Sequence, residues 1–274
     1  MDRLLAETGG PEPLAAAMRY AVLGPGKRLR PFLLLASAKL FGRDDDGVAR
    51  AAAALECVHA YSLVHDDLPA MDDDDLRRGR PTVHRAFDEA TAILAGDGLL
   101  TFAFSVLARL DALPEIRLDL IAGLAAAAGP AGMVGGQMLD IAAEGQALDE
   151  AAIRRLQGMK TGALLRYAAT AGPILAGASA ADRAALTRFG ESVGLAFQLA
   201  DDLIDATGSA EAAGKATAKD AARGKATLVA LHGIEAARAL LDRTVAEALS
   251  ALAAFGPEAD ILRAAARFVA ERQS

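Results

Sequence analysis

The sequence predicts an all-α protein, a bundle of helices packed around one core. Apolar residues recur at spacings of three and four along most of its 274 residues, which is the period of an amphipathic helix. The residues between them are mostly Ala, Leu, Arg and Glu, which are good helix formers. Alternating runs of Val, Ile and Thr closed by hairpin turns, which would indicate a sheet, do not occur in the sequence.

The stretches with this helical period follow one another along the whole chain. In order, they are 31–41, 48–64, 87–110, 116–128, 153–171, 181–204, 228–255 and 261–269. Breaks rich in Gly, Pro or charged residues separate many of them, at 24–26, 42–47, 68–81, 129–136, 177–179 and 208–224. Since none of these breaks resembles an interdomain linker, residues 1–274 are predicted to form a single domain.

Composition excludes several classes of protein. A net charge of -7 argues against a nucleic-acid binder, which normally needs a basic face. The single cysteine, Cys57, cannot form a disulfide within the chain and fits a reducing compartment. Residues 1–7 carry acids and lack the long apolar core of a secretory signal, so we expect a cytoplasmic protein. The apolar windows 121–136 and 163–181 are rich in Ala and Gly and fall short of the roughly 20 strongly apolar residues that a membrane span needs. No membrane span is therefore predicted.

Two aspartate-rich motifs each end an apolar, helix-like stretch. The first contains Asp66, Asp67, Asp72 and Asp73, and the second contains Asp201, Asp202 and Asp205. Carboxylates this close repel one another unless a cation neutralises them, and Mg²⁺ takes one or two protein carboxylates together with water and phosphate oxygens. The motifs therefore indicate a site for Mg²⁺ and a phosphorylated substrate. The acidic run 44–46 is interpreted as a solvated loop instead.

Helical spacing relates the residues of the second motif to one another. Gln198, Asp201 and Asp205 share one helix face, and Asp202 lies about a quarter turn away. The segment 208–225 that follows is rich in Gly and Lys. It is interpreted either as a mobile basic lid over a phosphate site or as a solvated connector.

Basic residues near both motifs could bind an anion. The segment 26–31 opens a helix after a Gly-Pro-Gly turn and carries Lys27 and Arg30. An exposed basic helix start is the alternative interpretation. His59 lies two turns before Asp66 on the same helix face, whereas His65, His84 and His232 are interpreted as structural. A phosphate-binding P-loop, a dinucleotide fingerprint, a catalytic triad and zinc-ligand spacing are all missing from the sequence, which disfavours ATP-dependent transfer and covalent catalysis.

Taken together, these motifs resemble those of the short-chain trans-isoprenyl diphosphate synthases. The resemblance extends from about residue 18 to residue 230 and is most specific in the block 56–82. The remaining matches are 26–31, Gly135-Gly136-Gln137 with Asp140, Lys160-Thr161-Gly162, Phe197-Gln198 with the second motif, and 224–227. The resemblance implies the isoprenoid-synthase helical bundle, with a central cavity between the two aspartate-rich motifs.

The resemblance also implies a role for each matching residue. The Mg²⁺ ligands that it implies, for three ions when substrate is bound, are Asp66, Asp67, Asp72, Asp201, Asp202 and Asp205. Residues expected to contact the allylic diphosphate are Arg77, Lys160, Lys225 and, in the closing loop, Lys215. Residues expected to bind isopentenyl diphosphate are Lys27, Arg30, His59 and Arg78. Thr161 and Gln198 would line the reacting centre. The implied reaction ionises the allylic diphosphate to a carbocation, which the double bond of isopentenyl diphosphate attacks, and the implied assembly is a homodimer.

Product length depends on the helix that precedes Asp66. Ser62 lies one turn below Asp66 and Tyr61 lies farther round the helix. In the family that the sequence resembles, an aromatic residue at the position of Tyr61, with Pro69-Ala70 inserted in the motif, is typical of enzymes that stop at farnesyl diphosphate, so the resemblance implies this product. Geranylgeranyl diphosphate is the alternative product, and a terpene cyclase or a non-catalytic partner subunit are the alternative functions. Only residues 1–23 precede the basic block, so a shortened N-terminal helix is expected.

Overall fold

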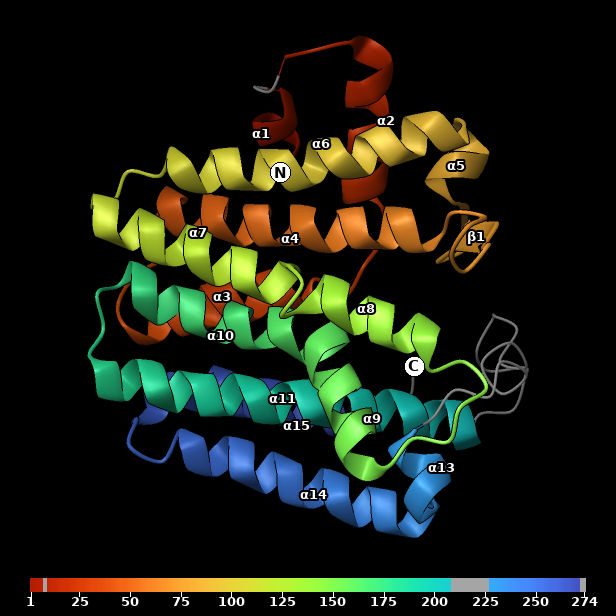
Figure 1. The fold of residues 1–274 in the computed structure, drawn as a ribbon. Helices are drawn as coiled ribbons and strands as arrows, with labels where there is room; N and C mark the ends of the chain where they lie inside the picture. The colour runs from red at the N-terminus through yellow and green to blue at the C-terminus, as the bar shows by residue number, and fades with distance from the viewer. Residues whose placement is uncertain (7–8, 208–226, 272–274) are drawn as a thin grey trace.

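A computed structural model describes residues 1–6, 9–207 and 227–271 of the chain. Within these residues the protein is almost entirely helical (Figure 1). Its strands are limited there to a two-residue antiparallel ladder, in which β1 (Leu76–Arg77) pairs with β2 (Arg80–Pro81). The prediction of an all-α protein is therefore confirmed.

The helices follow the sequence pattern closely. In chain order they are α1 (Asp2–Ala6), α2 (Glu12–Leu23), α3 (Leu29–Leu40), α4 (Asp46–Asp66), α5 (Val83–Ala86), α6 (Glu89–Ala108), α7 (Pro114–Ala128), α8 (Met133–Ala142), α9 (Glu150–Gln157), α10 (Ala163–Leu175), α11 (Ala180–Thr207), α13 (Leu228–His232), α14 (Ile234–Ala251) and α15 (Asp260–Glu271). The π-helical turn η1 (Gly158–Gly162) joins α9 to α10, and the 3-10 turn η2 (Pro257–Ala259) precedes α15.

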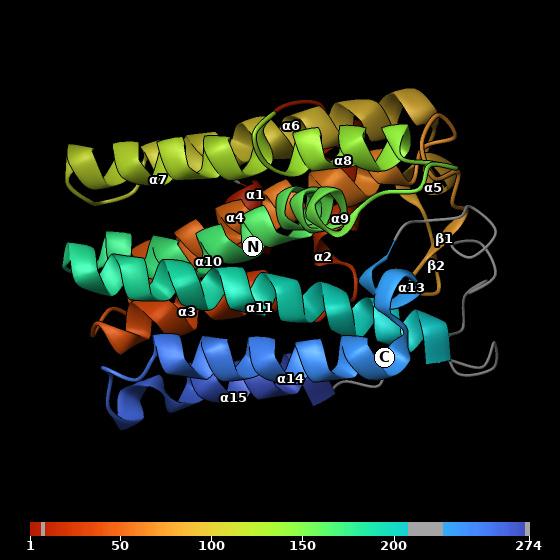
Figure 2. The same ribbon diagram turned by 60° about the horizontal axis from the view of Figure 1, so that its bottom comes forward.

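The long helices lie side by side. In Figure 1, α6 is above α4, α10 and α11 follow below, and α14 lies at the bottom, with α3 and α15 behind. The view in Figure 2 separates a layer of α6, α7 and α8 from a layer of α14 and α15, with α4, α10 and α11 between them. The central helices are buried by both outer layers, which explains why they are apolar around most of their circumference.

Besides α1, α2 and α5, which lie outside the predicted segments, the structure differs from these segments at three places. Residues 153–171 contain the turn η1, which separates α9 from α10. Residues 228–255 are divided at Gly233, whose φ of 84° suits glycine and ends α13 before α14 begins. Helix α8 begins inside the region 129–136 that was predicted as a break, because its glycines tolerate a close approach to η1: a Cβ on Gly136 would lie 2.2 Å from the backbone nitrogen of Lys160.

The acidic run 44–46 has a structural role that its interpretation as a solvated loop missed. The side chain of Asp45 caps α4, accepting a hydrogen bond from the backbone nitrogen of Gly47 at 2.9 Å. Asp46 is the first residue of α4 and pairs with Arg50 at 2.6 Å. The run therefore starts the helix that ends at the first aspartate motif.

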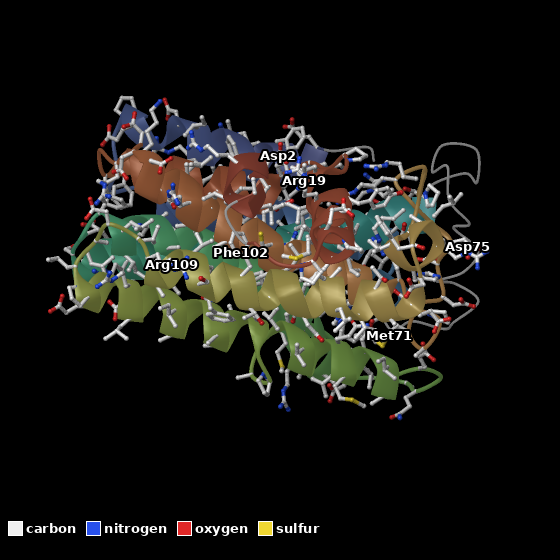
Figure 3. All side chains as sticks on the ribbon, turned by 90° about the horizontal axis from the view of Figure 1, so that it is seen from above. Asp2, Arg19, Met71, Asp75, Phe102 and Arg109 are labelled. Carbon is white, nitrogen blue, oxygen red and sulfur yellow. The ribbon has the colours of Figure 1, made fainter. Side chains whose placement is uncertain are left out.

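At the N-terminus, the chain forms two short helices before the basic block. Arg19 on α2 pairs with Asp2 on α1 at 2.6 Å, and the two residues lie together in Figure 3. The same view places Met71 and Asp75 at one end of the molecule and Arg109 at the other, with Phe102 midway along α6. The loop of the first aspartate motif thus occupies one end of the bundle.

Two helical stretches have the length and composition of a membrane span. They are Glu89–Ala108 and Pro114–Ala142, with mean hydropathies of 1.7 and 1.5. Core helices of a soluble bundle have the same composition, and both stretches pack against other helices here. The absence of a membrane span therefore stays a prediction.

Candidate active site

The two aspartate motifs lie at the C-terminal ends of two helices that finish at the same end of the bundle. Asp66 is the last residue of α4, and Asp201 and Asp205 lie in the last two turns of α11 (Figure 1). The C-terminus of a helix carries partial negative charge, so carboxylates are unfavourable there unless a cation is bound. The positions of the motifs favour a site for divalent cations and phosphate.

The loop after α4 is closed by its own backbone. The backbone nitrogen of Asp72 donates to the carbonyl oxygen of Asp66 at 2.8 Å. The backbone nitrogen of Met71 donates to the carbonyl oxygen of Leu68 at 2.9 Å. These bonds bring Asp72 back beside Asp66. Burial raises the pKa of Asp66 to about 6, and the negative charge of Asp72 adds to this effect while Lys160 opposes it.

Asp67 is buried and forms a bidentate ion pair with Arg77. Its exposed fraction is 3 %, and its Oδ1 lies 2.6 Å from Arg77 Nη2, while Arg77 Nε lies 2.9 Å from Oδ2. The hairpin between β1 and β2 makes this possible, because Arg78 and Gly79 have φ values of 53° and 76° and reverse the chain. Two residues predicted to bind metal and diphosphate are thus held against each other.

On α11, Asp202 is held between two glutamines. Gln157 Nε2 donates to its Oδ2 and Gln198 Nε2 donates to its Oδ1, both at 2.8 Å. Burial raises the pKa of Asp202 to about 6, although both amides oppose this shift. Gln198 in turn accepts a hydrogen bond from Thr161 Oγ1 at 3.2 Å.

Basic side chains from α3 and the hairpin gather beside α4, the helix that ends at the first aspartate motif. Arg30 Nη1 lies 3.4 Å from His59 Nε2, which joins the start of α3 to the middle of α4. Burial lowers the pKa of Arg30 to about 10, and burial next to Arg30 holds the pKa of His59 well below its ordinary value. Arg30 therefore stays charged at neutral pH, and His59 is a neutral hydrogen-bonding group.

Further contacts fix the position of this basic cluster. Glu56, which is buried, pairs with Arg28, and Arg78 Nη1 donates to the carbonyl oxygen of Pro25. The non-glycine residues with positive φ in the described part of the chain are Arg28, Asp73 and Arg78, and all of them lie at this site. Backbone conformations of this kind cost of order 1 kcal/mol each and tend to occur at functional sites.

The turn η1 carries Lys160 and Thr161. Lys160 Nζ lies 2.5 Å from Asp140 Oδ2 on α8. Glycines allow the close packing around the turn, since a Cβ on Gly194 of α11 would lie 2.9 Å from the Cα of Gly162. The π-helical turn breaks the regular helix where both predicted site residues are presented.

A cavity of about 590 Å³ lies between these groups. Its polar wall is formed by Asp66, Lys160, Thr161, Arg30 and His59. The remaining lining residues are Tyr61, Ser62, Leu63, His65, Leu68, Ala70, Met71, Ile93, Met133, Val134, Gln137, Met138 and Ile141, most of which are apolar. The cavity suits a ligand with an anionic head and a hydrocarbon tail.

Seven of the predicted site residues line this cavity, namely Arg30, His59, Tyr61, Ser62, Asp66, Lys160 and Thr161, whereas Asp67, Arg77 and Arg78 line a separate pocket. Asp201 is close enough to Arg30 to influence its ionisation, whereas Asp205 and Lys27 are exposed at the edge of the site. Lys215 and Lys225 lie outside the described residues. Among the described residues, no three carboxylate, His or Cys side chains are placed to hold a metal by themselves.

The sequence reasoning missed the supporting residues Gln157, Arg28 and Glu56. Gln157 and Glu56 are polar residues that fall on buried helix faces, 7 % and 4 % exposed. Such a polar residue in an apolar pattern was the available signal for both contacts, Gln157 with Asp202 and Glu56 with Arg28, because a buried polar group needs a partner. Position in the sequence alone does not identify that partner.

Comparison with known proteins agrees with this geometry. The sequence model of the polyprenyl synthetase family matches residues 11–256. Farnesyl diphosphate synthase from Escherichia coli K12 is 50% identical over 232 residues, covering 82% of this chain and 77% of the relative. The corresponding protein from Geobacillus stearothermophilus is 44% identical over 241 residues, covering 87% and 81% of the two chains.

Solved structures show the same likeness. An FPP/GFPP synthase from Zymomonas mobilis superposes with a TM-score of 0.89 at 46% identity, covering 98% of this chain and 94% of that chain. A geranyltransferase from Legionella pneumophila gives a TM-score of 0.87 at 34% identity, with coverages of 99% and 91%. The likeness therefore spans the whole arrangement of helices.

Proposed function

The chain belongs to the polyprenyl synthetase family, and we propose that it is a trans-prenyltransferase that condenses isopentenyl diphosphate head to tail with an allylic diphosphate. The product is farnesyl diphosphate, made from dimethylallyl and geranyl diphosphates with release of diphosphate. The observation that carries this proposal is the cavity of about 590 Å³ whose lining joins the polar side chains of Asp66, Lys160, Arg30 and His59 to a largely apolar remainder. The named relatives support the same activity.

Mg²⁺ fits the donors at this site, because the carboxylates are hard oxygen ligands at two helix C-termini. The proposed ligands are Asp66, Asp67, Asp72, Asp201, Asp202 and Asp205. Asp67 and Asp202 stay in this set because a carboxylate oxygen that accepts one hydrogen bond keeps a second lone pair. When bound with substrate, Mg²⁺ supplies positive charge for the departing diphosphate.

The protein's own cations bind the two diphosphates. Lys160 and Arg77 lie on the side of the first motif and are assigned to the allylic diphosphate, with Lys215 and Lys225 as further ligands. Arg30 and His59, joined at 3.4 Å, are assigned with Lys27 and Arg78 to isopentenyl diphosphate. Fixed cations stabilise charge that develops on the leaving oxygen, so the allylic C–O bond breaks more readily.

The resulting allylic cation faces the part of the cavity wall that Thr161 forms. The oxygens of Thr161 and Gln198 provide negative partial charge near this centre, and the apolar walls exclude water that would quench the cation. The double bond of isopentenyl diphosphate then attacks the cation, and a proton is lost to the released diphosphate. This route needs no side chain of the protein as a general base. His59, which is neutral, is assigned to binding the diphosphate of isopentenyl diphosphate.

Product length is assigned to the apolar part of the cavity. Tyr61 is 6 % exposed, lines the cavity and packs edge-on against His65, with ring centroids 5.7 Å apart. We propose that Tyr61 forms the floor on which the growing chain stops and that Ser62 lines the path above it.

The protein is further proposed to act as a homodimer in the cytoplasm. Large apolar side chains are exposed on α6 and α7, where Leu94 is 58 % and Leu118 65 % exposed, and a second copy would cover them. The single, buried Cys57 is compatible with a reducing compartment. Sedimentation of the purified protein measures the oligomeric state.

The central test is a condensation assay on the purified protein. Incubated with Mg²⁺, isopentenyl diphosphate and geranyl diphosphate, it should release diphosphate and form a fifteen-carbon product. The variants Asp66→Ala and Asp201→Ala should lower turnover by orders of magnitude and keep the helical circular dichroism, whereas Asp44→Ala, at an exposed carboxylate away from the cavity, should be unaffected. Absence of condensation by the unaltered protein would refute the proposal.

A further inference from the structure

A chain of hydrogen bonds runs behind the wall of the reaction cavity. It leads from Gln157, the last residue of α9, through Asp202 and Gln198 on α11 to Thr161 in the turn η1. Its three distances are 2.8, 2.8 and 3.2 Å. Thr161 lines the reaction cavity, while Gln157 lines a separate cavity of about 390 Å³. Gln157 is therefore not part of the wall of the reaction cavity.

The carboxylate of Asp202 determines how the next amide is turned. Both of its oxygens accept hydrogen bonds from amide nitrogens, so Gln198 must point its NH₂ group toward Asp202. The carbonyl oxygen of Gln198 then faces Thr161 and accepts a hydrogen bond from its hydroxyl group. With the opposite orientation, the positive end of the amide dipole would face the reacting centre.

Among the described residues, the side chain of Gln157 is hydrogen-bonded through its amide nitrogen and not through its oxygen. The side chain is 7 % exposed, and its Oε1 is buried without a hydrogen-bond partner in the described part of the chain. A buried oxygen without a hydrogen-bond partner lowers the stability of the fold by about 1–3 kcal/mol. An apolar side chain of similar size would avoid this cost. Packing alone therefore does not explain a glutamine at this position.

Asp202 depends on this donor. Among the described residues, no Lys, Arg or His forms an ion pair with its buried carboxylate, and its hydrogen bonds come from Gln157 and Gln198. Without Gln157 one oxygen of Asp202 would lack its amide donor, and the carboxylate would be free to rotate toward another partner. Rotation of Asp202 would release Gln198 from its orientation.

We propose that Gln157 is a positioning residue of the condensation reaction, which acts through Asp202 to keep the carbonyl oxygen of Gln198 directed toward the reacting centre. The inference deepens the proposed function and rests on it. A carbonyl oxygen held in this direction stabilises the developing allylic cation more than it stabilises the bound substrates. A defect should therefore appear in kcat rather than in KM.

Steady-state kinetics on the full-length protein test this inference. Gln157→Leu should lower kcat about tenfold and change either KM by less than about threefold. Gln157→His, which places a ring N–H at similar reach, should recover most of the loss. Gln157→Met offers a more flexible apolar replacement if the leucine variant does not fold. Gln146→Leu, at an exposed glutamine whose side chain donates to the carbonyl oxygen of Ala142, is the matched control and should behave as the unaltered protein.

A double variant separates positioning from simple destabilisation. If Gln157 acts through Gln198, then Gln157→Leu combined with Gln198→Leu should have the same kcat as Gln198→Leu alone. Losses that multiply, or a Gln157→Leu protein with unaltered kcat, would overturn the inference while leaving the proposed function intact. Failure of the unaltered protein to condense the substrates would instead overturn the proposed function and, with it, the inference.

Discussion

Asp67 and Arg77 form a bidentate ion pair in which the carboxylate is almost fully buried, with Nη2 and Oδ1 2.6 Å apart. The chain reverses at Arg78 and Gly79, and this hairpin returns Arg77 to the end of α4. The geometry prevents Arg77 from swinging freely into solvent. It also balances one of the carboxylates clustered at the helix C-terminus.

Loss of Arg77 should therefore weaken the fold as well as the activity. Arg77→Met removes the bidentate partner of the buried Asp67 carboxylate, and we expect the free energy of unfolding in urea to fall by about 3 kcal/mol. Adding Asp67→Asn should restore part of that loss, because the buried charge is then removed. Arg85→Met breaks the exposed pair with Asp75 and serves as the control, for which little change is expected. Equal stability of Arg77→Met and the unaltered protein would contradict the buried-pair argument.

Metal should bind strongly only together with diphosphate. The described residues contain no ready-made cluster of three ligands, and Mg²⁺ needs six oxygens, which substrate phosphates would complete. Thermal unfolding should shift little with MgCl₂ alone, but on the order of 5 °C when inorganic diphosphate is added at a hundredfold excess over its Kd. EDTA should abolish the shift. A full shift with MgCl₂ alone would show that the carboxylates form a complete site without phosphate.

Asp66 should make the metal-free protein less stable at alkaline pH. Burial raises its pKa to about 6 from an ordinary value near 4. Below about pH 4 the carboxyl is protonated in both the folded and unfolded states, so it makes no difference to stability. Between about pH 4 and 6 the carboxyl is ionised in the unfolded state but still protonated in the folded state, so stability of order 2 kcal/mol is lost over this range. Above about pH 6 the folded state keeps a buried charge and the loss is complete.

In EDTA, Asp66→Asn should consequently be more stable than the unaltered protein at pH 8, and the difference should vanish toward pH 4. Urea unfolding at several pH values measures it. Asp44→Asn removes an exposed carboxylate and is the matched control. A difference between Asp66→Asn and the unaltered protein that does not vary with pH would show that the charge of Asp66 is not the cause.

The sequence predicted most of the helices because burial imposes a regular period on them. Helix α4 illustrates this, since its apolar residues pack between α3 and α6 and its predicted extent differs from the observed one by two residues at each end. The turn η1 escaped prediction because Gly158 and Gly162 are compatible with an ordinary helix, and only tertiary packing against α8 and α11 produces the wider turn.

Within the site, the sequence identified many of the functional side chains but not which of them contact one another. Asp202 was expected to lie apart from Gln198 by about a quarter turn, yet their side chains meet because residues four apart on a helix are neighbours. Gln157 is 45 residues before Asp202, and no local pattern connects them. Contacts between distant segments depend on how the bundle closes, which one sequence does not reveal.

Tyr61 should limit the length of the product. Its ring lines the apolar part of the cavity one helical turn before His65, where a lengthening hydrocarbon chain would meet it. Tyr61→Ala should open this space and shift the product from fifteen carbons to twenty or more, measured by chromatography of the hydrolysed products. Truncation of a buried ring costs about 3–5 kcal/mol, so Tyr61→Leu provides a milder second variant. Tyr167→Phe is the control, because Tyr167 is equally buried but bonds to the carbonyl oxygen of Leu120 at 3.0 Å, away from the cavity. If both Tyr61 variants fold and still stop at fifteen carbons, another residue forms the floor.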